Sequence, residues 1–168
     1  MYTNNSDMEI SKGITVDIRG SEIKVKGSKG EVIKNFGPGV ILESDGSKIK
    51  ISTKQKEMIN TVKGIIKNMF KGTSEGYTRT MKILFSHFPI TLEIKGQQIF
   101  IKNFLGEKSP RKTKIEGNVK VSVKGQEVVI TGSNKEEVGQ TIANIKTATK
   151  IRKRDARIFQ DGIYLIGE

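Results

Sequence analysis

The sequence predicts an α+β fold made of two tandem copies of one domain, each a small antiparallel sheet with one helix packed on one face. The first observation is a repeat, because residues 18–26 (IRGSEIKVK) return 76 positions later as residues 94–102 (IKGQQIFIK). A second pair follows in the same order, residues 46–52 (GSKIKIS) and 125–131 (GQEVVIT). Each member of that pair leads into a stretch with helical periodicity, so order and spacing both indicate a duplication.

The repeat divides the 168 residues into two expected domains, 1–82 and 83–168. Each is about the size at which a hydrophobic core becomes self-sufficient. We expect features shared by both copies to build the fold, and features found in one copy to be where function was added.

The first copy has the period-two alternation of paired strands. A turn at Gly20 separates the first two strands, and the favoured turn pair Asp45-Gly46 separates the last two. The expected strands lie near residues 14–18, 23–26, 39–43 and 48–52. After Ser52 the period becomes helical, with Met58, Val62 and Met69 on one face. This pattern predicts a helix of about four turns that ends at Gly72.

The second copy repeats this scheme. Residues 77–88 are expected to form a strand that crosses into it, and Pro89 marks the end of that strand. Further strands are expected near residues 90–95, 98–102, 111–115, 119–124 and 127–131. A capping-box sequence at Ser133 opens a helix whose apolar stripe includes Val138 and Ile145. Residues 149–168 have no counterpart in copy one and are expected to form a basic excursion, then a short strand or hook that docks back.

The composition restricts the possible functions. The formal net charge of +12 favours a polyanionic partner. No apolar run approaches the ~20 residues that a membrane helix needs, and residues 1–8 do not resemble a secretory signal. The absence of cysteine excludes disulfides and thiolate metal sites, which fits a reducing compartment.

The residues needed for catalysis are scarce. His87 is the single histidine, so a catalytic triad would depend on it alone, and we interpret it as a packed or rim residue beside Phe85 and Phe88. The glycine-rich segments lack the spacing of a nucleotide-binding loop and are interpreted as turns. Phe100 stands where copy one has Lys24 and suggests base stacking, but it is isolated. We therefore expect neither an enzyme, nor a cofactor, nor a small-molecule substrate.

Two basic clusters set the second copy apart. Residues 1–83 and 84–168 each hold 15 basic and 9 acidic residues, yet four of the six arginines lie in these clusters. Arginine can bind phosphate oxygens in pairs, so the clusters predict contact with the RNA backbone rather than with base edges. The alternative is an ordinary solvated surface. The predicted RNA-binding residues are Lys108, Arg111, Lys112 and Lys114 in one cluster, and Lys150, Arg152, Lys153, Arg154 and Arg157 in the other.

Two glycines are expected to have a backbone role. Gly106 and Gly162 stand in Leu-Gly-Glu and Asp-Gly-Ile contexts. A turn with positive φ, or a close approach of the backbone to RNA, would explain glycine at both positions.

Three strings together resemble one known family. They are NFLGEKSPRKTKI at 103–115, FQDGIYLI at 159–166, and a linker from Tyr77 to SHFP at 86–89. They closely resemble the archaeal and eukaryotic branch of the large-subunit ribosomal protein L-six family. The closing motif of the bacterial branch is absent, and FQDGIYLI looks more archaeal than eukaryotic.

The resemblance implies two tandem α+β domains and a structural, non-enzymatic role in the cytoplasm. It implies binding to large-subunit ribosomal RNA mainly through the second domain, near the factor-binding side, beside other large-subunit proteins. The basic residues of both clusters then carry over as the expected RNA contacts. A free RNA chaperone or regulatory RNA-binding protein of the same fold is the alternative. Co-sedimentation with large subunits at high salt would distinguish the two.

Overall fold

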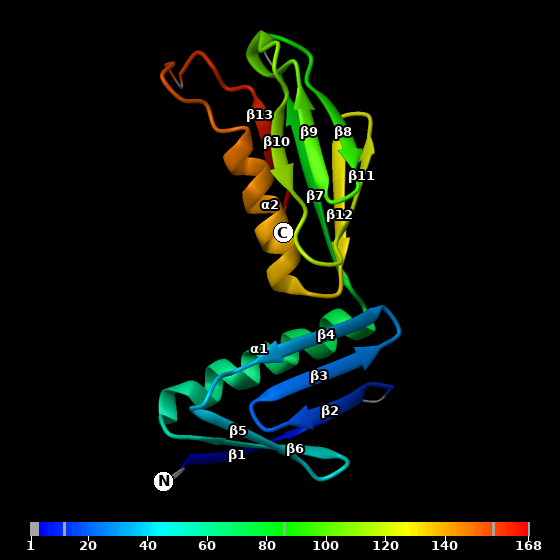
Figure 1. Ribbon diagram of the computed structural model, residues 1–168, viewed down its shortest axis with the longest axis vertical. Coiled ribbons are helices and arrows are strands. Elements are labelled where there is room, and N and C mark those ends of the chain that lie inside the picture. The colour runs from blue at the N-terminus through cyan, green and yellow to red at the C-terminus, as the bar shows by residue number, and fades with distance from the viewer. Residues whose placement is uncertain (1–3, 12, 86, 156, 168) are drawn as a thin grey trace. The chain divides into compact units, whose positions relative to one another are not determined.

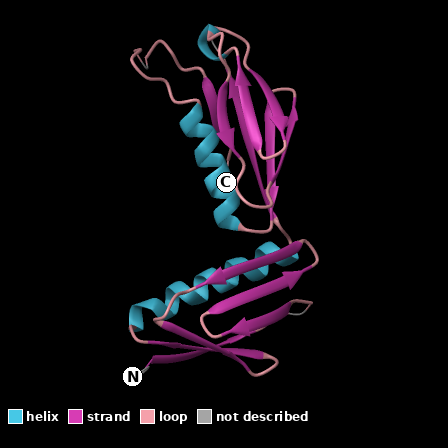
Figure 2. Ribbon diagram, in the orientation of Figure 1, coloured by secondary structure: helices cyan, strands magenta, loops and turns pink. Residues whose placement is uncertain are grey.

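A computed structural model describes residues 4–11, 13–85, 87–155 and 157–167 (Figure 1). Ser86 of the SHFP string lies outside these residues. The chain divides into two compact units between Gly76 and Tyr77, except that residues 133–135 group with the first unit. Both units contain antiparallel strands and a long helix, so the predicted α+β duplication is confirmed (Figure 2). The boundary suggested by the repeat, between residues 82 and 83, falls inside a strand of the second unit.

The first unit divides its strands between two three-stranded sheets, ordered β1-β6-β5 and β2-β3-β4, instead of forming the single sheet expected. Helix α1 (Lys56–Ser74) contacts strands of both sheets and closes a core that includes Ile23, Ile51 and Ile66. The strands are β1 (Asn4–Glu9), β2 (Thr15–Arg19), β3 (Glu22–Gly27), β4 (Gly30–Asn35), β5 (Val40–Ser44) and β6 (Lys48–Thr53).

Strand β1 was not predicted. Its sequence, NNSDME, contains one apolar residue, Met8, so the alternation that reveals a half-buried strand is missing. It nevertheless pairs antiparallel with β6 along its whole length, from Asn4 opposite Thr53 to Glu9 opposite Lys48. The position of β1 is therefore set by backbone pairing with a core strand, and its side chains give little sign of it in the sequence.

Helix α1 is longer than predicted. It covers 19 residues and passes through Gly72, which is buried, so the prediction that Gly72 ends the helix is wrong. The last turn has a tertiary partner, because the Lys29 N–H donates to the Thr73 carbonyl oxygen at 2.9 Å. Carbonyl groups at a helix end need such donors. The chain leaves the helix at Gly76, whose φ is 82°.

Gly27, the last residue of β3, lies against this helix end. A Cβ at Gly27 would lie 2.5 Å from the Thr73 carbonyl oxygen and 2.8 Å from its carbon. Because both are backbone atoms, Gly27→Ala should lower the free energy of unfolding of the first unit by about 2 kcal/mol. Chemical denaturation of the full chain measures this. Gly39→Ala is the control, since its Cβ would meet nothing within 4 Å and its φ is not positive. Equal stability of the two variants would contradict the contact.

The second unit contains a sheet ordered β10-β9-β8 and a four-stranded sheet ordered β11-β12-β7-β13. The two sheets and helix α2 (Lys135–Ala148) enclose a core that includes Met81, Ile101, Ile130 and Ile145. The strands are β7 (Tyr77–Leu84), β8 (Thr91–Lys95), β9 (Gln98–Lys102), β10 (Arg111–Lys114), β11 (Lys120–Lys124), β12 (Glu127–Gly132) and β13 (Gly162–Leu165).

The strand orders show how the copies correspond. The order β1-β6-β5 matches β7-β12-β11, and β2-β3-β4 matches β8-β9-β10. Strand β7 is therefore the counterpart of β1, which explains why the second unit begins at Tyr77.

Two segments distinguish the second unit. Residues 28–29 connect β3 to β4, whereas residues 103–110, with the 3-10 turn η1 (Phe104–Gly106), connect β9 to β10. We call residues 103–110 the insertion loop and residues 149–161 the basic tail. After the tail, β13 pairs antiparallel with β7, so the predicted return of the chain end onto its domain is confirmed.

Candidate nucleic-acid interface

The insertion loop has a tight, unusual backbone. Asn103 and Leu105 have φ of 58° and 52°, and Gly106 has φ of 75°. Residues other than glycine rarely adopt a positive φ, so contacts with other residues must stabilise this loop conformation. Phe104 is 1% exposed and anchors the loop in the core. The Asn103 side-chain amide donates to the Pro89 carbonyl oxygen at 3.0 Å.

The two glycines expected at turns differ. Gly106 has the positive φ of a turn, and a Cβ there would lie 3.1 Å from the Phe88 ring. Gly162 begins strand β13, and its φ is not positive. A Cβ there would instead lie 3.1 Å from the Tyr164 ring. The Asp-Gly turn expected at Gly162 is therefore absent, because the strand starts where the turn was expected.

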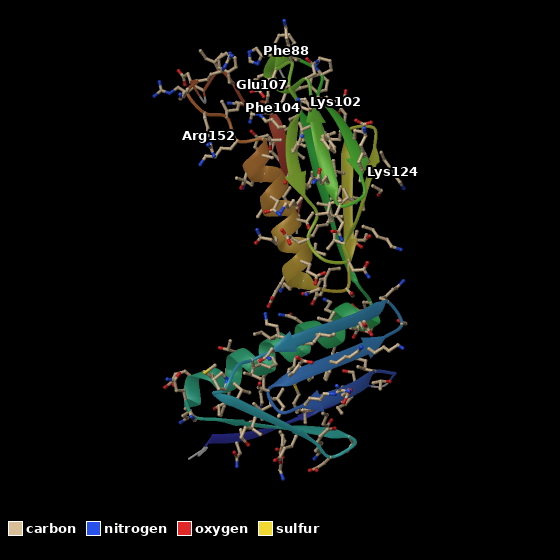
Figure 3. All side chains as sticks on the ribbon, viewed as in Figure 1. Phe88, Lys102, Phe104, Glu107, Lys124 and Arg152 are labelled. Atoms are coloured by element: carbon tan, nitrogen blue, oxygen red, sulfur yellow. The ribbon has the colours of Figure 1, made fainter. Side chains whose placement is uncertain are left out.

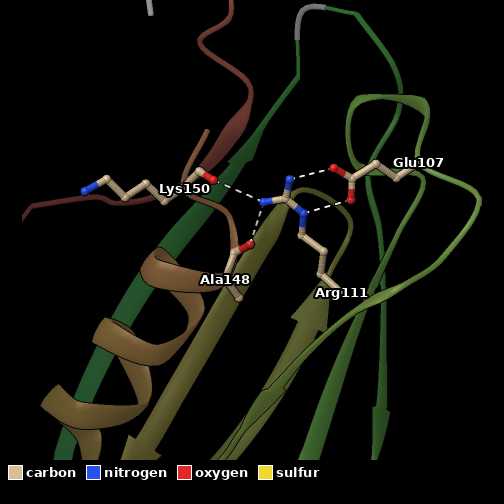
Figure 4. A network of polar contacts seen from close by, with 4 residues as sticks. All are labelled: Glu107, Arg111, Ala148 and Lys150. Carbon is tan, nitrogen blue, oxygen red and sulfur yellow. Dashed lines mark hydrogen bonds and ion pairs between the residues drawn. The ribbon is translucent and has the colours of Figure 1, made fainter. Parts of the chain in front are cut away.

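Arg111, the first residue of β10, connects the insertion loop to the basic tail (Figure 4). Its Nε and Nη2 groups donate to the two carboxylate oxygens of Glu107 at 2.8 and 2.6 Å. Its Nη1 group donates to the carbonyl oxygens of Ala148 at 2.9 Å and Lys150 at 3.1 Å. One guanidinium thus binds the loop carboxylate and the carbonyls where α2 ends and the tail begins.

The surroundings of Arg111 reinforce this arrangement. Its guanidinium carbon lies 4.3 Å from the centre of the Phe104 ring, and its side chain is 26% exposed. Hydrogen bonding from Arg111 lowers the pKa of Glu107, although partial burial of the Glu107 carboxylate acts in the opposite direction and raises that pKa. The pair's contribution to stability is therefore present at neutral pH, and it is lost only as the pH falls through the lowered pKa.

The basic tail folds around an aromatic ring. The Arg154 guanidinium carbon lies 4.8 Å from the centre of the Phe159 ring, and the His87 ring stacks on Phe159 at 4.6 Å between centroids. The Asp155 carboxylate accepts the Arg157 N–H at 2.9 Å, while the Asp155 carbonyl accepts the Phe159 N–H at 2.9 Å. These contacts fold the tail into a defined turn in which its three arginines are exposed.

His87 is joined to the segment after the tail. Its Nδ1 lies 2.8 Å from one carboxylate oxygen of Asp161, and its backbone N–H donates to the other at 3.2 Å. The Asp161 side chain is fully buried, whereas that of His87 is 32% exposed. His87 is therefore a rim residue with a structural partner. The described residues contain no group of three or more histidine, cysteine, aspartate or glutamate side chains that could hold a metal.

The structure brings the loop and tail to one end of the second unit. Figure 3 labels Phe88, Phe104, Glu107 and Arg152 toward that end. Lys112 and Lys114 instead lie on the outer face of β10, on either side of buried Thr113. Arg111 is half-buried, and the other eight predicted basic residues are exposed: Lys108, Lys112, Lys114, Lys150, Arg152, Lys153, Arg154 and Arg157.

Several residues that organise this end were not predicted. Glu107 and Asp161 entered the sequence analysis only as neighbours of Gly106 and Gly162. Both lie inside the strings of the family resemblance, which was the one available indication. Phe104, Phe159 and Phe88 gave no pattern of their own, because their partners come from distant segments.

Comparisons with known proteins agree with this architecture. The chain matches the family described as Ribosomal protein L6 over residues 10–76 and 88–162, one segment in each unit. It is 51% identical to the protein named large ribosomal subunit protein uL6 of Methanosphaera stadtmanae, over 94% of this chain and 89% of that protein. It is 45% identical to the protein of the same name from Methanocella arvoryzae, over 95% and 94% of the two chains. With both halves of the duplication matched, the chain belongs to the ribosomal protein L6 family.

Proposed function

We propose that this chain is a structural protein of the large ribosomal subunit that binds large-subunit ribosomal RNA through its second unit. Its place is near the factor-binding side, in the cytoplasm, beside other large-subunit proteins. The observation that carries the proposal is the Arg111 network, because it joins the two segments that only the second unit has. The insertion loop has one exposed lysine, Lys108, and the basic tail has two exposed lysines and three exposed arginines.

The charge of the two units supports this role. Residues 1–76 hold 13 basic and 9 acidic residues, and residues 77–168 hold 17 and 9, so the net charges are +4 and +8. Contacts to phosphate supply affinity without reading base identity, which suits a protein that recognises a folded RNA by shape. No helix among the described residues is long and apolar enough to cross a membrane.

Arg111 has a different role from the other basic residues in this proposal. Four of its five N–H donors already bind protein groups at 2.6 to 3.1 Å. It positions the insertion loop and the basic tail, and the exposed side chains around it contact the phosphates.

Separating the units tests which one binds RNA. Residues 77–168 should bind fragments of large-subunit RNA, and residues 1–76 should bind them weakly. The second fragment must begin at Tyr77, because β7 lies between β12 and β13 in its sheet. Filter binding at moderate salt measures both affinities. Equal affinities would contradict an interface in the second unit.

Sedimentation tests the ribosomal role. The full chain should co-sediment stoichiometrically with large subunits after washing at high salt, because a structural component is held by many contacts. A free RNA chaperone or regulator of the same fold would instead be released into the supernatant. Release would overturn the ribosomal assignment, even if the second unit bound RNA fragments.

A further inference from the structure

The outer face of the β8-β9-β10 sheet combines an aromatic ring with lysines. Phe100 lies at its centre, paired in register with Glu93 of β8 and Lys112 of β10. The next rung pairs Gln98 with Lys95 and with Lys114. These residues alternate with inward residues such as Ile99 and Ile101, which are fully buried, so they share the face turned away from the core. In Figure 1 this sheet lies toward the viewer.

The first unit provides a matched comparison. Its β2-β3-β4 sheet has the same order and the same β2-β3 register as β8-β9, with Lys24 at the position of Phe100 and Ile33 at that of Lys112. The ionisable residues on that face are Asp17, Arg19, Glu22, Lys24, Lys26 and Glu31, with a net charge of zero. On the second face they are Glu93, Lys95, Lys102, Lys112 and Lys114, with a net charge of +3. The shared fold therefore requires neither the charge nor the ring.

The lysines surround the Phe100 ring. The ammonium groups of Lys95 and Lys112 lie 5.8 and 5.6 Å from its centre. Glu93 pairs with Lys102 at 2.7 Å and with Lys95 at 3.4 Å. Hydrogen bonding from Lys102 is the largest cause of the lowered pKa of Glu93. The one carboxylate on the face is thus shared between two lysines, which leaves cationic charge in excess.

The geometry points to a binding site for an unpaired stretch of RNA, with one base stacked on Phe100 and the neighbouring phosphates on the surrounding lysines. An aromatic side chain on a sheet with flanking cations is the general requirement for holding single-stranded nucleic acid, because every base has a π-face. The site rests on the proposed function and deepens it. The insertion loop and basic tail bind folded RNA backbone, and this face binds exposed bases.

Replacing Phe100 by lysine separates stacking from charge. Phe100→Lys adds a positive charge and copies the first unit, where the same position holds Lys24 in a folded sheet. Contact with phosphates alone therefore predicts equal or tighter binding. Stacking predicts that the full chain loses about tenfold in affinity for an oligouridylate of about ten nucleotides. For a sugar-phosphate oligomer of the same length without bases, Phe100→Lys should cause no such loss of affinity.

A tryptophan variant gives a direct signal. The chain contains no tryptophan, so Phe100→Trp introduces a single fluorophore at the site. Its emission should be quenched when oligouridylate is added, and the affinity should stay within about twofold of the parent chain, since tryptophan also stacks. Unchanged emission at saturating oligouridylate would overturn the site. Undiminished binding of oligouridylate by the Phe100→Lys variant would also overturn the site.

Two controls separate this inference from the broader proposal. Lys24→Ala, at the matched position of the first unit, should not change oligouridylate binding. If Phe100→Lys has no effect while alanine at Arg152, Arg154 and Arg157 weakens binding to large-subunit RNA, the stacking site is wrong and the proposed function stands. If poly-glutamate competes fully with oligouridylate and Phe100→Lys weakens the binding of both, the face is a protein-docking surface, and the stacking site is wrong.

Discussion

Replacing His87 by alanine should lower the free energy of unfolding of the second unit by about 2 kcal/mol. The change removes the imidazole from the buried carboxylate of Asp161, 2.8 Å away, and removes the ring stacked on Phe159. A buried carboxylate that loses a close hydrogen-bonding partner costs more than the surface contact itself is worth. Chemical denaturation of the full chain measures the effect, and hydrogen exchange of the β13 amides localises it.

Tyr164→Phe is the matched control for this prediction. It removes a hydrogen bond from the Tyr164 hydroxyl to the Gln160 carbonyl oxygen at 3.0 Å, in the same segment but at an exposed position. Its cost should stay below about 0.5 kcal/mol. If His87→Ala were as mild as Tyr164→Phe, the pair with Asp161 would not hold the chain end on its domain.

The fold was largely predictable from the repeat, because the same order and spacing of strand and helix patterns in both halves indicate two copies of one domain. The helices and the strands with apolar alternation lie near their predicted positions. Strand β4 was missing from the expected strands. Strand β1 was missed as well, because it is a polar edge strand fixed by pairing with β6. The predicted end of α1 was wrong, because contacts from the β3-β4 turn stabilise the last helical turn beyond Gly72. The errors at β1 and at the end of α1 have the same physical cause: hydrogen bonds to distant segments, which leave no periodic pattern in the sequence.

The candidate site was predicted in composition but not in organisation. The sequence grouped Arg111 with the other basic residues, because all of them lie in the two basic clusters of copy two. It gave no sign that Glu107 and the carbonyl oxygens of Ala148 and Lys150 would occupy the Arg111 guanidinium. Such contacts depend on where the tail passes the loop. Phe100 was noted in the sequence but interpreted as isolated, because the lysines that surround it come from three strands.

The arginines of the basic tail should carry much of the salt dependence of RNA binding. Changing Arg152, Arg154 and Arg157 together to alanine should reduce the slope of log K against log salt by about 2. Each is exposed, so each is available to neutralise a phosphate. Lysine at the same three positions should keep most of the slope but lose some affinity, because the paired geometry is lost while the charge stays. Binding of the full chain to large-subunit RNA across a salt series measures both.

Arg111 should behave differently from these three residues. Arg111→Ala removes all four hydrogen bonds of its guanidinium, so we expect a loss of about 2 kcal/mol in the stability of the second unit. The salt slope should change little, because the group is already neutralised by Glu107. Arg111→Lys should also be destabilising, since an ammonium cannot bridge the carboxylate and both carbonyls. Faster exchange of the Glu107 amide would locate the damage in the insertion loop. If Arg111→Ala instead reduced the slope by about 1 with unchanged stability, Arg111 would be a phosphate ligand, and the loop and tail would be held together by other contacts.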